Sequence, residues 1–258
     1  MPYRQTDTLC RRAYGQAGLT TEMQLFLVIL SAIAPIVAIL WYICRKDKQQ
    51  PEPPKWLMKA FGYGVVSVFI SIALSLAVSA LSGLDLDTDT CYSVPQAFAD
   101  AFMLAAIPEE LAKFVMLWLL LRKNPYYDEL FDGIVYAVFV SMGFAAVENV
   151  LYLVDGAADG SWISTGIVRA LLSVPGHAIF AVLMGYYYSL YHFGINRRLK
   201  TAAMILVAPI LAHGIFDGIL FSIQINEVFA AIGIIILIIF FNILKKKGKE
   251  KISRLMNQ

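Results

Sequence analysis

One stretch of the chain, Ile107–Lys113, places three charged side chains inside an apolar run that extends from Val94 to Leu121. That run is long enough to cross a bilayer, because about 20 mostly apolar residues span the hydrocarbon core as a helix. Near the centre of such a helix each charge costs roughly 2.5–3.5 kcal/mol even on a lenient scale. This cost is tolerated where charged groups face the interior of a helix bundle and find partners. The stretch therefore predicts a membrane protein with a polar interior site.

The composition of the whole chain supports this class. Of the 258 residues, 59% are hydrophobic and 16% are charged, and the mean hydropathy is +0.67, whereas soluble domains average roughly 45–50% apolar and about 25% charged residues. Because every backbone polar group in lipid needs an internal partner, we expect the spans to be helices. The net charge of +2 does not indicate nucleic-acid binding, since the basic residues lie in loops and at the C-terminus. We predict an all-α, polytopic membrane protein without a separate soluble domain.

Seven apolar runs are long enough to span a membrane, and they form a single transmembrane helical domain over residues 23–244. Residues 1–22 are a polar tail before this domain, and residues 245–258 are a basic tail after it. The predicted spans are Met23–Cys44, Ala60–Leu81, Val94–Leu121, Phe131–Val154, Gly166–Phe193, Leu199–Ile223 and Val228–Leu244.

Loops that contain lysine or arginine alternate with loops that contain neither. Basic residues follow the first, third, fifth and seventh spans, while the loops after the second, fourth and sixth spans contain none. Loops with an excess of lysine and arginine are cytoplasmic in most membrane proteins. We therefore predict a cytoplasmic C-terminus and an N-terminus on the outside, although Arg4, Arg11 and Arg12 in the N-terminal tail weigh against this orientation.

Two of the three cysteines, Cys10 and Cys91, fall on the predicted extracytoplasmic side. A disulfide is stable in that compartment. The sequence leaves open whether these cysteines form a disulfide or remain two unpaired thiols.

Most of the polar side chains within the spans lie in spans three to six, which cover residues 94–223. The interiors of the first, second and seventh spans contain no ionisable residue. This distribution predicts a polar chamber walled by four helices and shielded from lipid by the other three. The candidate chamber residues in these spans are, in order, Glu109, Glu110, Lys113, Glu148, Asn149, His177, His213 and Asp217.

These residue types suit hydrolysis without a covalent intermediate. Glu109 and Lys113 are four residues apart and share a helix face, as do His213 and Asp217. One of the two adjacent carboxylates, Glu109 or Glu110, can accept a proton from water near neutral pH, while its neighbour pairs with Lys113 or stays protonated. Histidines can hold the water or stabilise an oxyanion, and Asp217 can orient His213. A buried structural ion cluster is the alternative for the two glutamates and the lysine.

The same side chains are also a candidate metal site. Zinc accepts histidine nitrogens and carboxylate oxygens, and a catalytic site leaves one position open for water. No HExxH motif is present, so spacing gives no independent support for a metal. Zinc is therefore an open possibility. Its candidate ligands are Glu109, Glu148, His177 and His213.

Four short motifs occur in order, one in each of the four chamber spans. Glu109–Lys113 fits the pattern EExxK, Phe144–Tyr152 fits FxxxExxxY, His177–Gly185 fits HxxFxxxxG, and His213–Asp217 fits HxxxD. Together these motifs resemble those of the PrsW family of intramembrane proteases, which are distant relatives of the type II CAAX prenyl endopeptidases. The match covers roughly residues 94–221, about half of the chain.

The resemblance implies an intramembrane peptidase, either glutamate-dependent or metal-dependent, in the bacterial cell membrane. Its implied substrates are single-pass membrane proteins such as anti-sigma factors, cleaved on the extracytoplasmic side in regulated proteolysis and stress signalling. Its implied partners are therefore such a substrate and the lipid bilayer, with no nucleic acid.

Roles for individual residues are also implied by the resemblance. By comparison with the prenyl endopeptidases, Glu109 would be the general base and Glu110 would support it. His177 and His213 would position water or the oxyanion, and Asp217 would assist. In the second motif the endopeptidases carry a histidine where this chain has Glu148. The role of that histidine therefore does not transfer to Glu148. The supporting residues are expected to be Lys113, Glu148, Asn149 and Tyr152.

Two other functions use the same residue types. Carboxylates and histidines inside a bundle also form relays in proton or divalent-cation transporters and channels. Against this alternative, the sequence shows no inverted repeat and no pair of broken helices. A membrane scaffold without activity is the third alternative, and the retained Glu109, Glu110, His177 and His213 argue against it.

Overall fold

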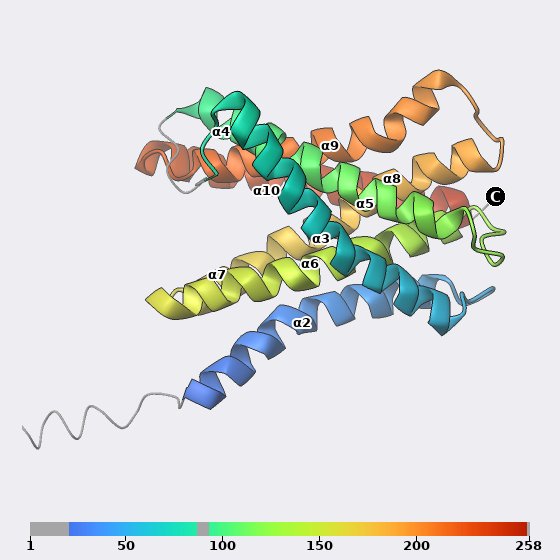
Figure 1. Ribbon diagram of the computed structural model, residues 1–258, viewed down its shortest axis with the longest axis horizontal. Helices are drawn as coiled ribbons and strands as arrows, with labels where there is room; N and C mark the ends of the chain where they lie inside the picture. The colour runs from blue at the N-terminus through green and yellow to red at the C-terminus, as the bar shows by residue number, and fades with distance from the viewer. Residues whose placement is uncertain (1–20, 87–92, 257–258) are drawn as a thin grey trace, which may run out of the picture.

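The computed structural model describes residues 21–86 and 93–256 of the chain, and these residues form a bundle of helices without strands (Figure 1). The predicted all-α class is confirmed. Cys10 and Cys91 lie outside the described residues, so the question of a disulfide between them stays open. The helices are α2 (Thr21–Lys46), α3 (Pro54–Ser82), α4 (Val94–Asp100), η1 (Ala101–Ala106), α5 (Ile107–Leu121), α6 (Asp132–Asp159), α7 (Trp162–Val168), η2 (Arg169–Ser173), α8 (Val174–His192), α9 (Leu199–Ser222) and α10 (Glu227–Met256).

Within the described residues, six helical segments are long and apolar enough to cross a membrane. They are Ile29–Lys46, Pro54–Ser82, Asp132–Gly156, Trp162–His192, Leu199–Ser222 and Glu227–Leu255. The remaining predicted span, the third (Val94–Leu121), consists of α4, η1 and α5 in direct succession, and the longest of these has 15 residues. This agrees with the predicted polytopic architecture of about seven spans.

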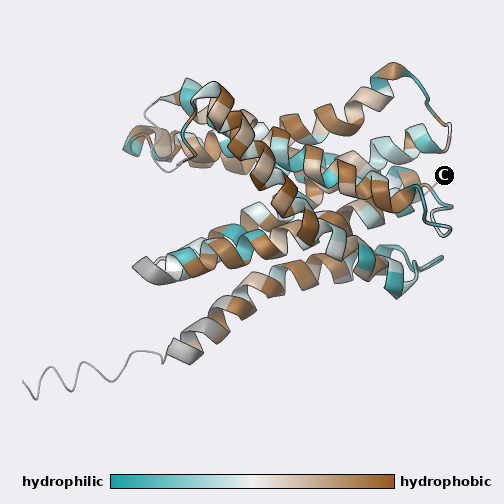
Figure 2. Cartoon of the chain, in the orientation of Figure 1, coloured by the Kyte–Doolittle hydropathy of each residue, from teal (hydrophilic) through white to brown (hydrophobic). Residues whose placement is uncertain are grey.

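The helices divide into inner and outer members. Within the described residues 72% of the α6 span is buried and 61% of the α7–α8 span, whereas only 17–22% of the α2, α3 and α10 spans is buried. Most residues of the helices are hydrophobic, and hydrophilic residues gather in the loops at the end of the bundle that holds the C-terminus (Figure 2). The outer faces of α2, α3 and α10 carry large exposed apolar side chains, as a lipid-facing surface requires. These three helices are the shielding spans that the sequence predicts.

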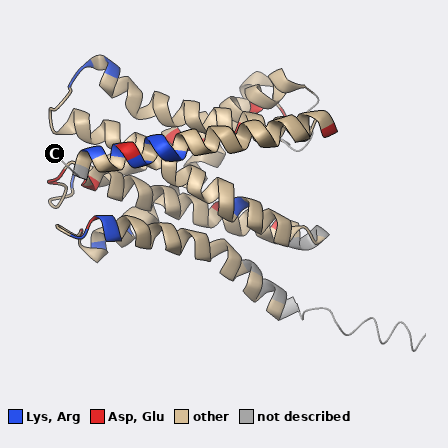
Figure 3. Ribbon diagram, turned by 180° about the vertical axis from the view of Figure 1, so that it is seen from behind, with Lys and Arg blue, Asp and Glu red and all other residues tan. Residues whose placement is uncertain are grey.

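Most lysines and arginines lie at the end of the bundle that holds the C-terminus (Figure 3). The α2–α3, α5–α6 and α8–α9 connections all lie at this basic end (Figure 1). The opposite end carries the α6–α7 and α9–α10 connections, which contain no lysine or arginine. This arrangement agrees with the alternation of basic and non-basic loops along the sequence. The side of the membrane that each end faces stays a prediction.

Glycines allow α6 to pack closely on a neighbouring helix. A Cβ atom added at Gly64 of α3 would overlap the carbonyl oxygen of Val140, and one added at Gly143 of α6 would overlap that of Phe61. Small residues at such crossings let two helix backbones approach in the membrane. The α3–α6 contact therefore depends on the two glycines and fixes where α6 lies behind the chamber.

We expect Gly64→Ala to lower the free energy of unfolding by about 1–3 kcal/mol, because the added methyl group forces α3 and α6 apart. Thermal unfolding of the purified chain measures this effect. Gly62→Ala is the matched control, since a Cβ at Gly62 meets no atom within 4 Å. Equal midpoints for the two variants would contradict the close crossing.

Two wide helical turns lie immediately before the chamber residues of α5 and α8. In η1 the N–H of Ile107 donates to the carbonyl of Phe102, five residues earlier, and η2 has the same pattern. Each turn is followed by a proline, which has no N–H to donate. The carbonyl of Leu104, four residues before Pro108, instead accepts a hydrogen bond of 2.7 Å from the Ser75 hydroxyl. Such π-helical turns are frequent at functional sites.

Candidate active site

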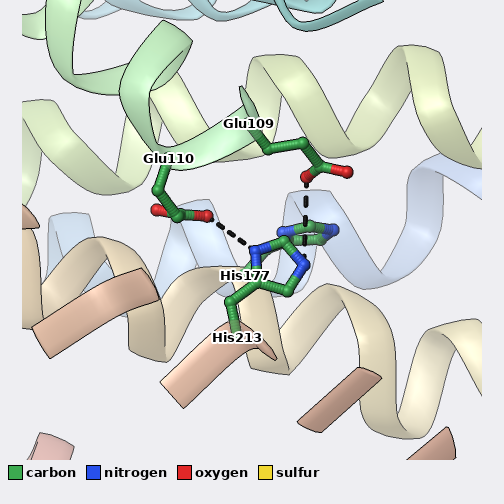
Figure 4. Close-up of side chains that lie close together, drawn as sticks. All are labelled: Glu109, Glu110, His177 and His213. Atoms are coloured by element: carbon green, nitrogen blue, oxygen red, sulfur yellow. Dashed lines mark hydrogen bonds and ion pairs between the residues drawn. The ribbon is translucent and has the colours of Figure 1, made fainter. Parts of the chain in front are cut away.

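Four ionisable side chains from three helices point toward one another in the interior of the bundle (Figure 4). Glu109 and Glu110 come from α5, His177 from α8 and His213 from α9. One nitrogen or oxygen atom from each of the four lies within 4.8 Å of the others. The structure thus brings together residues that are up to 104 positions apart in the sequence, as the chamber prediction expects.

Lys113 is the centre of the cluster. Its Nζ lies 3.0 Å from Glu109 Oε2, 2.8 Å from Glu110 Oε1 and 3.2 Å from His177 Nδ1. The lysine side chain is 2% exposed, and a buried ammonium is stable only where carboxylates and hydrogen-bond acceptors surround it. Its charge also lies 4.0 Å from the centroid of the Phe144 ring, within the range of a cation–π interaction. Lys113 therefore fixes the two adjacent glutamates at a defined separation.

The partners of His177 define its protonation state. A lysine ammonium can only donate hydrogen bonds, so His177 Nδ1 accepts the one from Lys113. His177 Nε2 then carries the ring proton and donates it to Glu148 Oε2 at 2.8 Å. We assign His177 as the neutral Nε2–H tautomer from these partners.

His213 has different partners. Its Nδ1 lies 3.0 Å from Glu110 Oε1, and its Nε2 lies 2.9 Å from Asp217 Oδ2. An ionised carboxylate only accepts hydrogen bonds, so both ring nitrogens donate and His213 is an imidazolium cation. The Phe180 ring stacks on it with centroids 4.8 Å apart. Asp217 thus orients His213, as the spacing of four residues predicts.

Arg169 belongs to the chamber, although none of the four motifs contains it. Its Nη2 lies 2.9 Å from Glu148 Oε2, and its Nε donates to Asn149 Oδ1 at 2.6 Å. Asn149 in turn donates to the carbonyl of Ala32 at 2.9 Å. The guanidinium lies 4.4 Å from the centroid of the Tyr152 ring. The supporting residues of the second motif therefore gather around an arginine that the motif does not contain.

One signal in the sequence could have identified Arg169. It is the only lysine or arginine within the apolar run of the fifth span, and Glu148 in the fourth span has no lysine or arginine near it in the sequence. Charges buried in a bundle pair with one another. Counting buried charges of each sign would therefore have pointed to this pair.

The charges of the chamber nearly cancel. Four carboxylates face three cations, which leaves one negative charge if every carboxylate is ionised. The groups counted are Glu109, Glu110, Glu148 and Asp217 against Lys113, Arg169 and His213.

A cavity of about 450 Å³ connects the chamber to the bundle end opposite the basic one. Its lining includes Asp155 and Ser161 at the α6–α7 connection and Asp217 deeper inside. Glu109 lines this cavity and Glu110 does not. The Glu109 side chain is 14% exposed, whereas that of Glu110 is 1% exposed. Of the two adjacent glutamates, Glu109 is the one that water in the cavity can reach.

Comparison with known proteins assigns the family. A family model described as "PrsW family intramembrane metalloprotease" matches residues 52–244, well over half of the chain. The chain belongs to the PrsW family. The Protease PrsW of Geobacillus kaustophilus is 34% identical over 198 residues, which are 77% of this chain and 81% of that protein. The Protease PrsW of Clostridioides difficile is 34% identical over 238 residues, 92% of this chain and 93% of that protein. No solved structure matches the chain.

This PrsW-family protein is therefore an intramembrane peptidase. The Protease PrsW of Bacillus subtilis is also similar, at 32% identity over 232 residues, which are 89% of this chain and 98% of that protein. The matches cover all four motifs that carry the resemblance, because they extend over most of both chains. The predictions of family, fold class and enzyme class are confirmed.

The family description names a metalloprotease, and the types of side chain in the chamber are those that zinc binds. Their arrangement does not fit an ion. The ammonium of Lys113 already lies within 3.2 Å of Glu109, Glu110 and His177, and a zinc ion at the same atoms would be repelled by it. Both ring nitrogens of His177 and His213 also have hydrogen-bond partners already. A metal would require these side chains to rearrange.

Proposed function

We propose that this PrsW-family peptidase cleaves single-pass membrane proteins, such as anti-sigma factors, on the extracytoplasmic side of the bacterial membrane. The cleavage would be a step of regulated proteolysis in stress signalling. The observation that supports this proposal best is the cavity that leads to Glu109 from the bundle end whose loops lack lysine and arginine. The positive-inside rule predicts that this end faces outward. A substrate segment just outside the membrane could enter there.

Glu109 would act as the general base. A water molecule in the cavity would give a proton to the Glu109 carboxylate while its oxygen attacks the peptide carbonyl carbon. When the carbon–nitrogen bond breaks, Glu109 would return this proton to the leaving amine. Lys113 holds one Glu109 oxygen at 3.0 Å and so orients the carboxylate.

His213 would stabilise the negative charge that develops on the carbonyl oxygen. Its Nε2 lies 3.9 Å from Glu109 Oε2, so its positive charge lies beside the carboxylate of the base. A fixed positive charge at such a position is worth several kcal/mol to a developing oxyanion. Glu110 and Asp217 keep His213 doubly protonated and in place.

His177 would be positioned by a chain of contacts that starts at Asn149. Asn149 accepts from Arg169, Arg169 pairs with Glu148, and Glu148 accepts the Nε2 proton of His177. Each link is buried or partly buried. Arg169 and Glu148 are therefore proposed as positioning residues that act through His177.

We infer that the reaction depends on the glutamate and needs no bound metal, because Lys113 lies where the candidate metal ligands converge. Treatment of the purified protein with EDTA and with 1,10-phenanthroline is expected to leave the cleavage rate within about twofold of the untreated rate. Elemental analysis of the same sample gives the metal content. Loss of activity on chelation and its recovery with added zinc would contradict this inference.

Cleavage in a heterologous bacterial host tests the proposed substrate class. The protein would be co-expressed with each tagged single-pass anti-sigma factor of its source genome, beside the variants Glu109→Gln and His177→Ala. We expect one full-length substrate to disappear only with the unmodified enzyme. A fragment cut near the extracytoplasmic face of the cell membrane should appear in its place. If no candidate is cut while all three proteins accumulate equally in the membrane, the anti-sigma-factor assignment is wrong.

A further inference from the structure

A second cavity of about 490 Å³ lies between α8, α9 and α10, separate from the active-site cavity. Its wall is apolar and includes Leu183 of α8, Ala208 and Ile215 of α9, and Phe240 of α10. Lys247, Lys251 and Arg254, from the C-terminal part of α10, also line it. α10 runs toward the bundle end that holds the C-terminus (Figure 1). We call this cavity the basic-rimmed groove. Its volume is within the range of about 300–1,000 Å³ that is usual for small-molecule sites.

The three cations of the groove lack carboxylate partners. None of them forms an ion pair within the described part of the chain, and the groove contains one carboxylate, Glu250. The buried cations of the active site differ, since Lys113 and Arg169 each contact a carboxylate within 3.0 Å. The groove therefore has an excess of positive charge beside an apolar wall.

Aromatic side chains hold one of these cations in the groove. Lys251 Nζ lies 3.8 Å from the centroid of the Tyr186 ring and 4.4 Å from that of the Tyr187 ring. It also donates a hydrogen bond to the Tyr187 hydroxyl at 3.3 Å. Cation–π contacts stabilise an ammonium without neutralising it, so the charge of Lys251 remains available to an anion.

We propose that the basic-rimmed groove binds an anionic phospholipid of the adjoining leaflet. The phosphate would contact Lys247, Lys251 and Arg254, and an acyl chain would lie against the apolar wall. Basic pockets between transmembrane helices bind anionic headgroups in this way. The positive-inside rule accounts for the presence of basic residues at this end of the bundle, but it does not explain why they surround an apolar cavity. Lys246 of the same helix is exposed and does not line the groove.

Lipid binding to the full chain in neutral detergent tests the proposal. Native mass spectrometry would compare phosphatidylglycerol with phosphatidylcholine of the same acyl chains. Three cations contribute about 1 kcal/mol each near an anionic headgroup, so we expect phosphatidylglycerol to bind about 100-fold more tightly. Equal affinity for the two lipids would overturn the proposal.

Charge-removing variants locate the site. Lys247→Gln/Arg254→Gln changes two exposed side chains of the groove and is expected to weaken phosphatidylglycerol binding about 30-fold. The matched control is Lys246→Gln/Lys200→Gln, which removes two charges at the same end outside the groove and is expected to keep the affinity within twofold. An equal loss of phosphatidylglycerol affinity in both double variants would show that the lipid is attracted by the basic surface in general, and it would refute the groove as the binding site. Displacement of the lipid by inorganic phosphate at equal concentration would also refute the proposal.

Discussion

Replacing Glu109 with glutamine is expected to lower the rate of peptide cleavage by about 10²–10⁴-fold while the protein keeps its fold. This range is what a positioned general base contributes. Glutamine has the shape of glutamate and can still accept the hydrogen bond from Lys113, but its amide does not take a proton from water at neutral pH. Single-turnover cleavage of a tagged substrate in proteoliposomes measures the rate. Thermal unfolding of the same sample measures the fold.

Glu110→Gln is the informative comparison, because the two glutamates are adjacent and differ in environment. Glu110 is 1% exposed and holds both Lys113 and His213 through one oxygen. Removing its charge leaves two buried cations with one carboxylate fewer, so we expect the unfolding midpoint to fall together with the activity. A variant Glu109→Gln that cleaves at the wild-type rate would contradict its role as base. A Glu110→Gln variant that loses activity with an unchanged midpoint would reverse the two roles.

The sequence predicted contacts within a helix better than contacts between helices. Residues four apart share a helix face, and the Glu109–Lys113 and His213–Asp217 pairs are both present. Spacing carries no such information for two different helices. The contact of Lys113 with His177 depends on how α5 and α8 pack, which the sequence pattern does not specify.

The difference between the adjacent glutamates was not predictable from the pattern either. Their order in the motif gives no direction for either side chain. The direction is set by η1, whose wide turn precedes α5 and rotates its face relative to a regular helix. Pro108 and the hydrogen bond from Ser75 to Leu104 stabilise this irregular segment. The presence of a polar chamber follows from the distribution of charges, whereas access of Glu109 to the cavity follows from this local geometry.

Arg169→Leu is expected to lower the stability of the protein strongly. It leaves the charge of Glu148 buried without its cation, and removal of one partner from a buried ion pair typically costs about 3–5 kcal/mol. Chemical denaturation of the purified variant measures this loss. Arg169→Lys keeps the charge but cannot bond Glu148 and Asn149 at once, so an intermediate loss is expected.

The double variant Arg169→Leu/Glu148→Leu separates a structural role of this pair from a role in positioning His177. Replacing both buried ions by apolar side chains is often neutral for stability, so most of the lost free energy of unfolding should return. The rate constant for cleavage should stay low with little change in KM, because His177 Nε2 has lost its acceptor and the ring is no longer held in place. If stability and rate both recover, the Arg169–Glu148 pair only supports the fold. Recovery of stability alone means that the pair orients His177 for the reaction.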